Sequence, residues 1–332
     1  MFKRLLILSL AGILLTACGV DSKHFKIEGR LLNMNQGELY LYSDNDGVDG
    51  IDTIKIEGGR FAYEITCEEP TSMVLVFPNF SELPVYAEPG KSIQLDGDAS
   101  HLKELKMDGS KTNKLMSDFR EQIAKASPPE IRAYARRMIE DHPQWPLGIY
   151  LVKKYFVTTP EPDYREAERL LQLMKKEQPR NGALAALVKR VSALSKSDKG
   201  NRLPMFTAYD INGKLVSSSD LTHGVAVIIS WASWSYDSMG MLRQVKQLLR
   251  GKAGRVKVVA ISVDAGKTDC RNALRYDSLA WPIVCDGNML EGKTVQQLGL
   301  ARVPGNLVVK DGRIVARDLN TDDLKKKIEE YL

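Results

Sequence analysis

The sequence predicts an all-β N-terminal domain, a helical connector and an α/β C-terminal domain. The chain has 332 residues, more than the roughly 250–300 at which one hydrophobic core stops growing. Short alternating segments fill residues 24–105, whereas buried-strand and helix patterns alternate from residue 203 onward. We therefore place a signal peptide at 1–17, a β-sandwich-like domain at 18–110, the connector at 111–199 and the α/β domain at 200–332.

The first residues have the layout of a signal peptide. Lys3 and Arg4 precede the apolar stretch Leu5–Leu15, which is too short to span a bilayer as a helix. The Leu-Thr-Ala-Cys run that ends at Cys18 resembles the lipobox of bacterial lipoproteins, which implies lipid attachment, palmitate included, at that cysteine. An ordinary secretory signal with an unmodified cysteine is the alternative.

Several acyl chains on Cys18 would supply the multiple anchors that stable membrane attachment needs. We therefore expect a lipid-anchored protein of the cell envelope. Gly19 follows the cysteine in place of the Asp that often marks inner-membrane retention, which favours the outer membrane.

Composition and charge exclude some function classes. The chain is 43% hydrophobic and 27% charged, which argues against a disordered chain and against a multi-spanning membrane protein. Its net charge is +5, of which Lys3 and Arg4 contribute two. Because no basic stripe interleaved with aromatic residues accompanies this charge, we expect no nucleic-acid partner.

The segment from His24 to Leu105 reads as a run of short strands. The pair Gly58-Gly59 separates two alternating segments and is a strong hairpin signal, because glycine accepts positive φ. Strands at this turn-punctuated spacing predict a small β-sandwich. The strands are expected at 25–31, 37–42, 51–56, 60–65, 72–77, 83–87 and 92–95.

The β-rich segment resembles a domain of unknown function that precedes thioredoxin-like modules in Gram-negative envelope lipoproteins. The resemblance rests on two short motifs, Phe77-Pro78 and the run from Tyr86 to Ile93. Cys67 follows a strand and is expected to be a small buried residue.

From Lys111 to Ser195 the apolar residues recur at helical spacing. Leu115, Phe119 and Ile123 lie four residues apart, and Pro128-Pro129 and His142-Pro143 delimit another helix. Further helices are expected at 147–155, 164–176 and 183–194. We assign no chemistry to this connector.

The C-terminal segment predicts a sheet with parallel central strands. The run at 225–230 is almost entirely apolar, as in a parallel strand that is buried on both faces, and residues 256–263 are expected to form a second buried strand. Helices are expected at 238–251 and 268–277 and at the C-terminus, and a hairpin of strands 307–309 and 314–316 closes the sheet.

This order resembles the thioredoxin-like superfamily, in the branch of the alkyl-hydroperoxide-reductase/thiol-specific-antioxidant domains and membrane-anchored thiol–disulfide oxidoreductases. The most specific phrase runs from Trp231 to Ser238, where active members read Trp-Ala-Ser-Trp-Cys-x-x-Cys. The second is Val303-Pro304, which matches the family's cis-proline loop. The resemblance covers residues 203–332 and implies a thioredoxin-like fold there.

Ser235 and Ser238 occupy the positions of the two redox cysteines. In the family, the first cysteine lies at a helix N-terminus, which lowers its pKa, and its thiolate attacks a disulfide. Serine has no such two-electron sulfur couple, so the dithiol cycle cannot run through this motif. The structural interpretation of both serines is that they cap a helix.

Three cysteines remain after Cys18, so at most one bridge forms among Cys67, Cys270 and Cys285. A disulfide between Cys270 and Cys285 is left open. An oxidoreductase or peroxidase acting through Cys270 or Cys285 is the alternative function.

The preferred function is a redox-inactive module that binds an envelope protein or peptide. The expected binding residues are Trp234, Tyr236, Asp237, Val303 and Pro304, which would hold an extended peptide by backbone pairing and aromatic contacts. We expect no cofactor and no metal. A third possibility is a structural envelope protein in which the β-rich domain carries the interaction.

Overall fold

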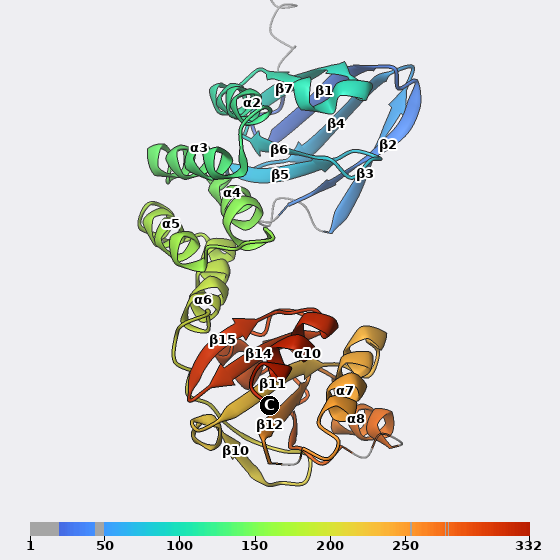
Figure 1. The fold of residues 1–332 in the computed structure, drawn as a ribbon. Helices are drawn as coiled ribbons and strands as arrows, with labels where there is room; N and C mark the ends of the chain where they lie inside the picture. Colours follow the sequence, from blue (N-terminus) through green and yellow to red (C-terminus); the bar gives the residue numbers. More distant parts are fainter. Residues whose placement is uncertain (1–19, 44–49, 253, 276, 278) are drawn as a thin grey trace, which may run out of the picture. The chain divides into compact units, whose positions relative to one another are not determined.

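The computed structural model describes residues 20–43, 50–252, 254–275, 277 and 279–332. The chain divides into two compact units, one ending at Leu187 and one running from Val188 to Leu332 (Figure 1). The division falls inside α6 (Gly182–Lys196), within the predicted connector. Cys18 lies outside the described residues. Within the described ranges, no helix has the length and apolar character needed to cross a membrane.

The first unit contains one eight-stranded sheet, which confirms the predicted all-β character. The strand order is β6-β5-β2-β3-β4-β1-β7-β8. The predicted strands are all present to within a few residues, and only the short β8 was missed. The strands are β1 (His24–Leu32), β2 (Gln36–Tyr42), β3 (Ile51–Glu57), β4 (Arg60–Thr66), β5 (Thr71–Val76), β6 (Glu82–Ala87), β7 (Lys91–Asp98) and β8 (Lys106–Asp108).

Hydrogen bonds link all eight strands, whereas the sequence predicts the two separate sheets of a sandwich. The halves β6-β5-β2-β3 and β4-β1-β7-β8 meet only at the pair Glu57–Arg60. Between these residues Gly58 and Gly59 adopt φ of 58° and 74°, the left-handed conformation that glycine tolerates. The predicted glycine turn therefore forms, but the two strands separate after this one pair: β3 pairs with β2 and β4 pairs with β1.

Helical elements complete the first unit: α2 packs against both β6 and β8, the two ends of the strand order, and η1 packs against β7 (Figure 1 shows α2). The Asn113 side chain joins α2 to β6, because its Oδ1 accepts from the Tyr86 N–H at 2.8 Å and its Nδ2 donates to the Tyr86 carbonyl at 2.7 Å. The helical elements are η1 (Ala99–Glu104), α2 (Lys111–Ile123), α3 (Pro128–Asp141), α4 (Gly148–Val152), the π-helical turn η2 (Lys153–Val157) and α5 (Tyr164–Glu177).

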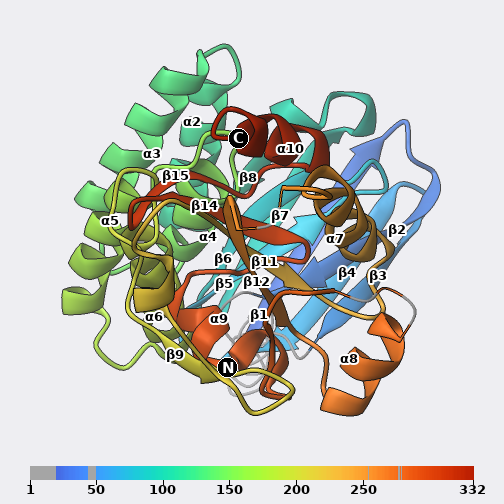
Figure 2. The ribbon, with the colours of Figure 1, turned by 60° about the horizontal axis from the view of Figure 1, so that its bottom comes forward.

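The second unit has a five-stranded sheet in the order β13-β12-β11-β14-β15, and Figure 2 shows β14 between β15 and β11. The central strand β11 pairs parallel with β12 and antiparallel with β14. The strands are β11 (Val225–Trp231), β12 (Val256–Ser262), β13 (Ile283–Cys285), β14 (Gly305–Lys310) and β15 (Arg313–Arg317); a separate pair is β9 (Thr207–Tyr209) and β10 (Leu215–Ser217).

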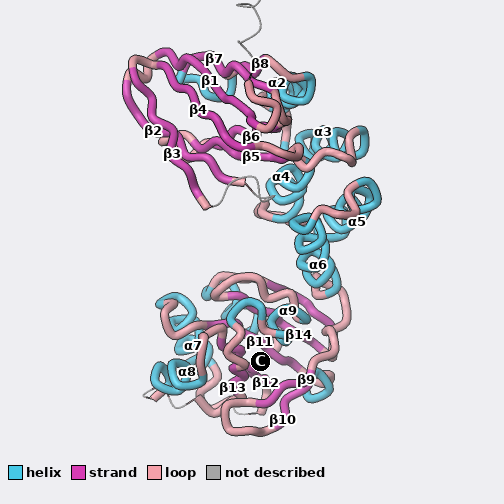
Figure 3. Tube along the Cα trace, turned by 180° about the vertical axis from the view of Figure 1, so that it is seen from behind, coloured by secondary structure: helices cyan, strands magenta, loops and turns pink. Residues whose placement is uncertain are grey.

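Both faces of this sheet are covered. Val225, Val227 and Ile229 of β11 belong to one core cluster together with α7, α8 and α10, whereas the alternate residues Ala226 and Ile228 belong to a second cluster with α9. Figure 3 shows α7 and α8 on one side and α9 on the other. The helices are α7 (Tyr236–Leu248), α8 (Lys267–Leu274), α9 (Lys293–Gln297) and α10 (Thr321–Glu329), with short turns η3 (Ser218–Leu221) and η4 (Met289–Glu291). The predicted α/β fold is confirmed.

Candidate functional site

The degenerate motif lies at the carboxyl end of the central strand. β11 ends at the fully buried Trp231, and residues 232–235 lead directly into α7. Ser235 has extended backbone angles and is the N-cap of α7, because its Oγ accepts from the Ser238 N–H at 3.3 Å. The helix therefore begins two residues earlier than the predicted Ser238.

The hydroxyl of Ser238 is buried and bonded only to backbone. Its Oγ accepts from the Ala232 N–H at 3.1 Å and lies within donating distance of the Ser235 carbonyl at 2.9 Å and of the Ala232 carbonyl at 3.1 Å. Its exposed fraction is 0%. Ser238 thus closes the turn between β11 and α7, whereas the helix cap expected of both serines is formed by Ser235 alone.

A buried aspartate that the sequence reasoning missed supports the same turn. The Asp264 carboxylate accepts from the Ser233 N–H at 2.9 Å, from the Ser233 hydroxyl at 2.7 Å and from the Ser262 hydroxyl at 2.7 Å. These bonds offset the cost of burying a carboxylate. The only signal in the sequence is an acidic residue just after the buried strand that ends at Ser262.

The loop before β14 meets the motif at the same edge of the sheet. Ser230 pairs with Gly305 across β11 and β14. The Ser230 hydroxyl donates to the Arg302 carbonyl at 2.8 Å and accepts from the Gly305 N–H at 3.0 Å. The Val303–Pro304 peptide bond in this loop is cis, as the resemblance implies.

Two aromatic side chains of the motif face solvent. Trp234 is 65% exposed and Tyr236 is 87% exposed, and Asp237 is also exposed in the first turn of α7. Val303 and Pro304 are half-buried. The fold thus brings all five predicted binding residues to one end of the sheet.

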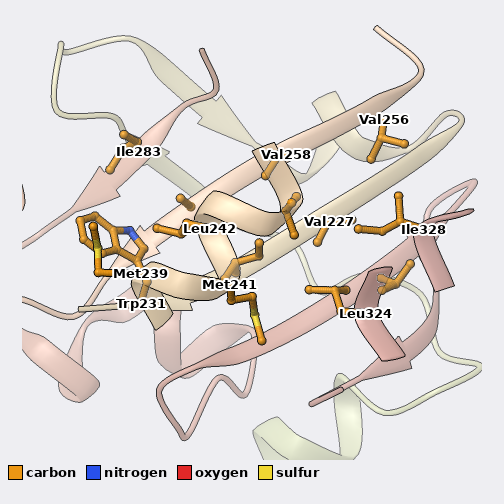
Figure 4. Close-up of a cluster of buried hydrophobic side chains, with 14 of the residues drawn as sticks. Val227, Trp231, Met239, Met241, Leu242, Val256, Val258, Ile283, Leu324 and Ile328 are labelled. Carbon is orange, nitrogen blue, oxygen red and sulfur yellow. The ribbon is translucent and has the colours of Figure 1, made fainter. Parts of the chain in front are cut away.

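The helix that carries the motif rests on a packed core. Figure 4 shows Met239, Met241 and Leu242 of α7 among Trp231, Val227 and other buried side chains. Both methionines are therefore core residues. A rigid helix beneath the motif holds the exposed aromatic residues on a fixed base.

Cys270 and Cys285 lie next to each other as buried free thiols. Burial raises the pKa of the Cys270 thiol to about 12, and the neighbouring Cys285 adds to this rise. Since the thiolate is the reactive form, Cys270 has little nucleophilic character in the folded state. Cys67 is also free and buried, as expected, and burial raises the pKa of its thiol.

Among the described residues, no group of histidine, cysteine, aspartate or glutamate side chains could hold a metal ion. The motif offers hydroxyl and backbone groups, exposed aromatic rings and one exposed carboxylate. Such a surface can form hydrogen bonds and stacking contacts with a partner.

Two family models match separate parts of the chain. Residues 25–116 match a domain of unknown function (DUF4369), and residues 198–332 match Redoxin. A curated relative, the thiol-disulfide oxidoreductase ResA of Bacillus thuringiensis subsp. konkukian, is 22% identical over 139 residues, which are 41% of this chain and 78% of the relative.

Similar solved structures come from Bacteroides species. A domain from Bacteroides thetaiotaomicron, named as the C-terminal domain of a thiol-disulfide oxidoreductase, is 30% identical with a TM-score of 0.37; the match covers 41% of this chain and 97% of that domain. A thiol-disulfide oxidoreductase from Bacteroides fragilis is 26% identical with a TM-score of 0.37, and the match covers 40% of this chain and 100% of that one.

Proposed function

We propose that this chain, whose C-terminal domain belongs to the thioredoxin-like family, binds an extended peptide or protein segment without catalysing thiol–disulfide exchange. The observation that carries this proposal is the chemistry of the two motif positions. Ser235 caps α7 and Ser238 is buried against backbone groups, so neither position supplies a thiolate. Disulfide exchange requires a thiolate to attack sulfur and a second thiol to resolve the mixed disulfide.

The remaining surface has the features of a peptide-binding site. Trp234 and Tyr236 expose most of their rings beside the loop that contains Pro304. Aromatic side chains contribute large contact areas at low entropic cost, and an extended peptide can pair with free backbone groups beside them. This supports binding of an extended segment rather than of a compact surface.

We also propose that the protein is anchored by lipid in the cell envelope. The lipobox-like sequence at Cys18 supports lipid attachment and retention in the envelope, with the outer membrane favoured. Replacing Cys18 with serine should then release the protein from membranes into the soluble fraction. Retention of the Cys18→Ser variant in membranes would contradict the lipid anchor.

A reductase assay tests the absence of thiol chemistry. The wild-type chain should not accelerate the reduction of insulin by dithiothreitol, whereas Ser235→Cys/Ser238→Cys should, since it restores both sulfur atoms at a helix N-terminus. As a control, Ser235→Cys alone supplies an attacking thiol but no resolving thiol, and it should be much less active than the double variant. Turnover by the wild-type chain would refute the proposal.

A peptide-binding assay tests the surface itself. We expect a library of short immobilised peptides to yield binders, and Tyr236→Ser should weaken their affinity by about tenfold, the usual scale for an aromatic anchor. Tyr209→Ser is the matched control, because Tyr209 is 65% exposed on β9 in the same domain. Equal effects of the two substitutions would place the binding surface elsewhere.

A further inference from the structure

The first unit contains a pocket that the proposed function does not use. Its volume is about 510 Å³, within the range of about 300–1,000 Å³ that is usual for small-molecule sites. The walls come from β6, the turn before it, η1, α2, α3 and the α4–η2 segment. All of these elements belong to the same compact unit.

One part of the pocket is apolar and aromatic. Phe77, Met116 and Phe119 are buried in its wall, and the Phe119 ring meets that of Tyr155 edge to face with 5.9 Å between centroids. Phe80 also lines the pocket, yet it is 87% exposed, which places it at the mouth. An apolar ligand body would cover this ring.

The backbone of Phe80 supports a functional role for its side chain. Phe80 has φ of 62°, a left-handed conformation that bulky residues seldom adopt. Its N–H donates to the Phe77 carbonyl at 2.8 Å, and the Phe77 N–H donates to the Ser81 carbonyl at 3.0 Å. Unfavourable backbone conformations of this kind gather at ligand-contacting positions.

The other part of the pocket carries a cation without an acidic partner. Arg120 donates to the carbonyls of Leu105 at 3.1 Å and Leu102 at 2.7 Å. Within the described part of the chain, no Asp or Glu lies within ion-pair distance of its guanidinium, and the ionisable side chains that interact with it are Tyr150 and Tyr155. Burial lowers the pKa of Arg120, so an anion beside it would offset the lost hydration.

The charges that surround Arg120 leave the pocket positive. Lys103 and Lys154 also line it, and among the described residues the only lining carboxylate is that of Glu82. Glu82 already accepts from Lys154 at 2.9 Å and from the Tyr150 hydroxyl at 3.1 Å. Its negative charge is therefore matched by Lys154, which leaves Arg120 and Lys103 uncompensated.

The segment that carries Lys154 and Tyr155 is itself unusual. Residues 153–157 form a π-helical turn that directly continues α4. Such turns are rare in proteins and occur frequently at functional sites. This observation is independent of the charges and of the strained Phe80.

We propose that this pocket binds an amphiphilic organic anion with one carboxylate head and an apolar body. The head lies against the Arg120 guanidinium, which has five N–H donors and uses two groups for the carbonyls of η1 and the residue after it. The apolar body lies along Phe77 and Phe119 and beneath Phe80. This site is separate from the motif of the second unit, so each proposal can fail without the other.

Calorimetric titration of the purified full chain tests the site, with decanoate below its micelle-forming concentration as the probe. Decanol has the same chain length and no charge. We expect decanoate to bind at least about tenfold more tightly than decanol, the scale of one charge-assisted hydrogen bond. No measurable decanoate binding, or equal affinities for the two ligands, would overturn the proposal.

Variants locate the site. Arg120→Gln should reduce the affinity for decanoate to that for decanol, while Lys114→Gln, an exposed change on the same helix, should alter neither. Because Arg120 also ties α2 to η1, Phe80→Ser provides a second variant at an exposed position and should weaken both ligands. Wild-type affinity for decanoate in Phe80→Ser or in folded Arg120→Gln would refute the assignment.

Discussion

The Asp264 carboxylate holds Ser233 through two hydrogen bonds, one from the Ser233 N–H at 2.9 Å and one from its hydroxyl at 2.7 Å. Ser233 lies within the motif loop, and Asp264 follows the neighbouring strand β12. The shape of the motif therefore depends on a residue from another part of the chain. This dependence can be measured.

Replacement of Asp264 by alanine should lower the free energy of unfolding of the second unit by about 2–3 kcal/mol, since it leaves buried donors without an acceptor. Asp269→Ala is the control, because Asp269 is exposed in the first turn of α8 and should cost under about 1 kcal/mol. Chemical denaturation followed by tryptophan fluorescence measures both. A similar loss in the two variants would show that Asp264 does not support the loop.

Gly305 is required for the close approach of the proline loop to β11. A Cβ atom there would lie 2.7 Å from the Ser230 Oγ and 2.9 Å from the Arg302 carbonyl oxygen. Gly305→Ala should therefore destabilise the second unit by about 1–3 kcal/mol. Thermal unfolding compares it with Gly240→Ala.

Gly240 lies within α7, and a Cβ atom at this position would have no described neighbouring atom within 4 Å. Alanine at that position should stabilise the helix by about 0.5–1 kcal/mol. The two glycine substitutions should therefore change the stability of the second unit in opposite directions. Equal melting temperatures of the two variants would contradict the close approach at Gly305.

The buried thiols should be unreactive in the folded chain. We expect Cys270 and Cys285 to react with Ellman's reagent at least about tenfold more slowly in buffer than in denaturant, because both thiols are buried and burial also raises the pKa of Cys270. Ser235→Cys is the positive control, since position 235 is half-buried at a helix N-terminus. Fast labelling of Cys270 or Cys285 in the folded chain would support the alternative function, catalysis through these cysteines.

Glu82 should make the stability of the first unit depend on pH. Burial disfavours its ionised form, but the hydrogen bond and charge of Lys154 outweigh this and hold the pKa of Glu82 below its ordinary value of 4.5. A lowered pKa stabilises the folded state above the unfolded-state pKa, and this contribution is lost as pH falls through the folded-state pKa.

Glu82→Gln should therefore lower the free energy of unfolding by about 1 kcal/mol or less at pH 7. The difference from wild type should shrink as the pH is lowered below 4.5. Denaturant titrations at several pH values measure this trend. If the stability difference between the variant and wild type does not change with pH, the negative charge of Glu82 is not what stabilises its contacts with Lys154 and Tyr150.

Much of the secondary structure could be predicted because it follows from local patterns. The alternation around Gly58-Gly59 predicts the hairpin, and the apolar run from Val225 predicts the buried central strand. The short β8 was missed because Lys106–Asp108 is too short to show a period. The single continuous sheet was also missed, since the residue pattern of a strand does not show which distant strand it pairs with.

The sequence by itself determined that the motif has no thiol chemistry. Positions 235 and 238 carry a serine oxygen in place of a cysteine sulfur, which depends on the residue type and not on its surroundings. Only the tertiary structure decided that Asp264 holds the motif loop, that Cys270 lies against Cys285, and that Arg120 borders a pocket with no acidic partner among the described residues. These relationships join residues far apart in the chain. They arise from how elements pack, which the local spacing of residue types does not encode.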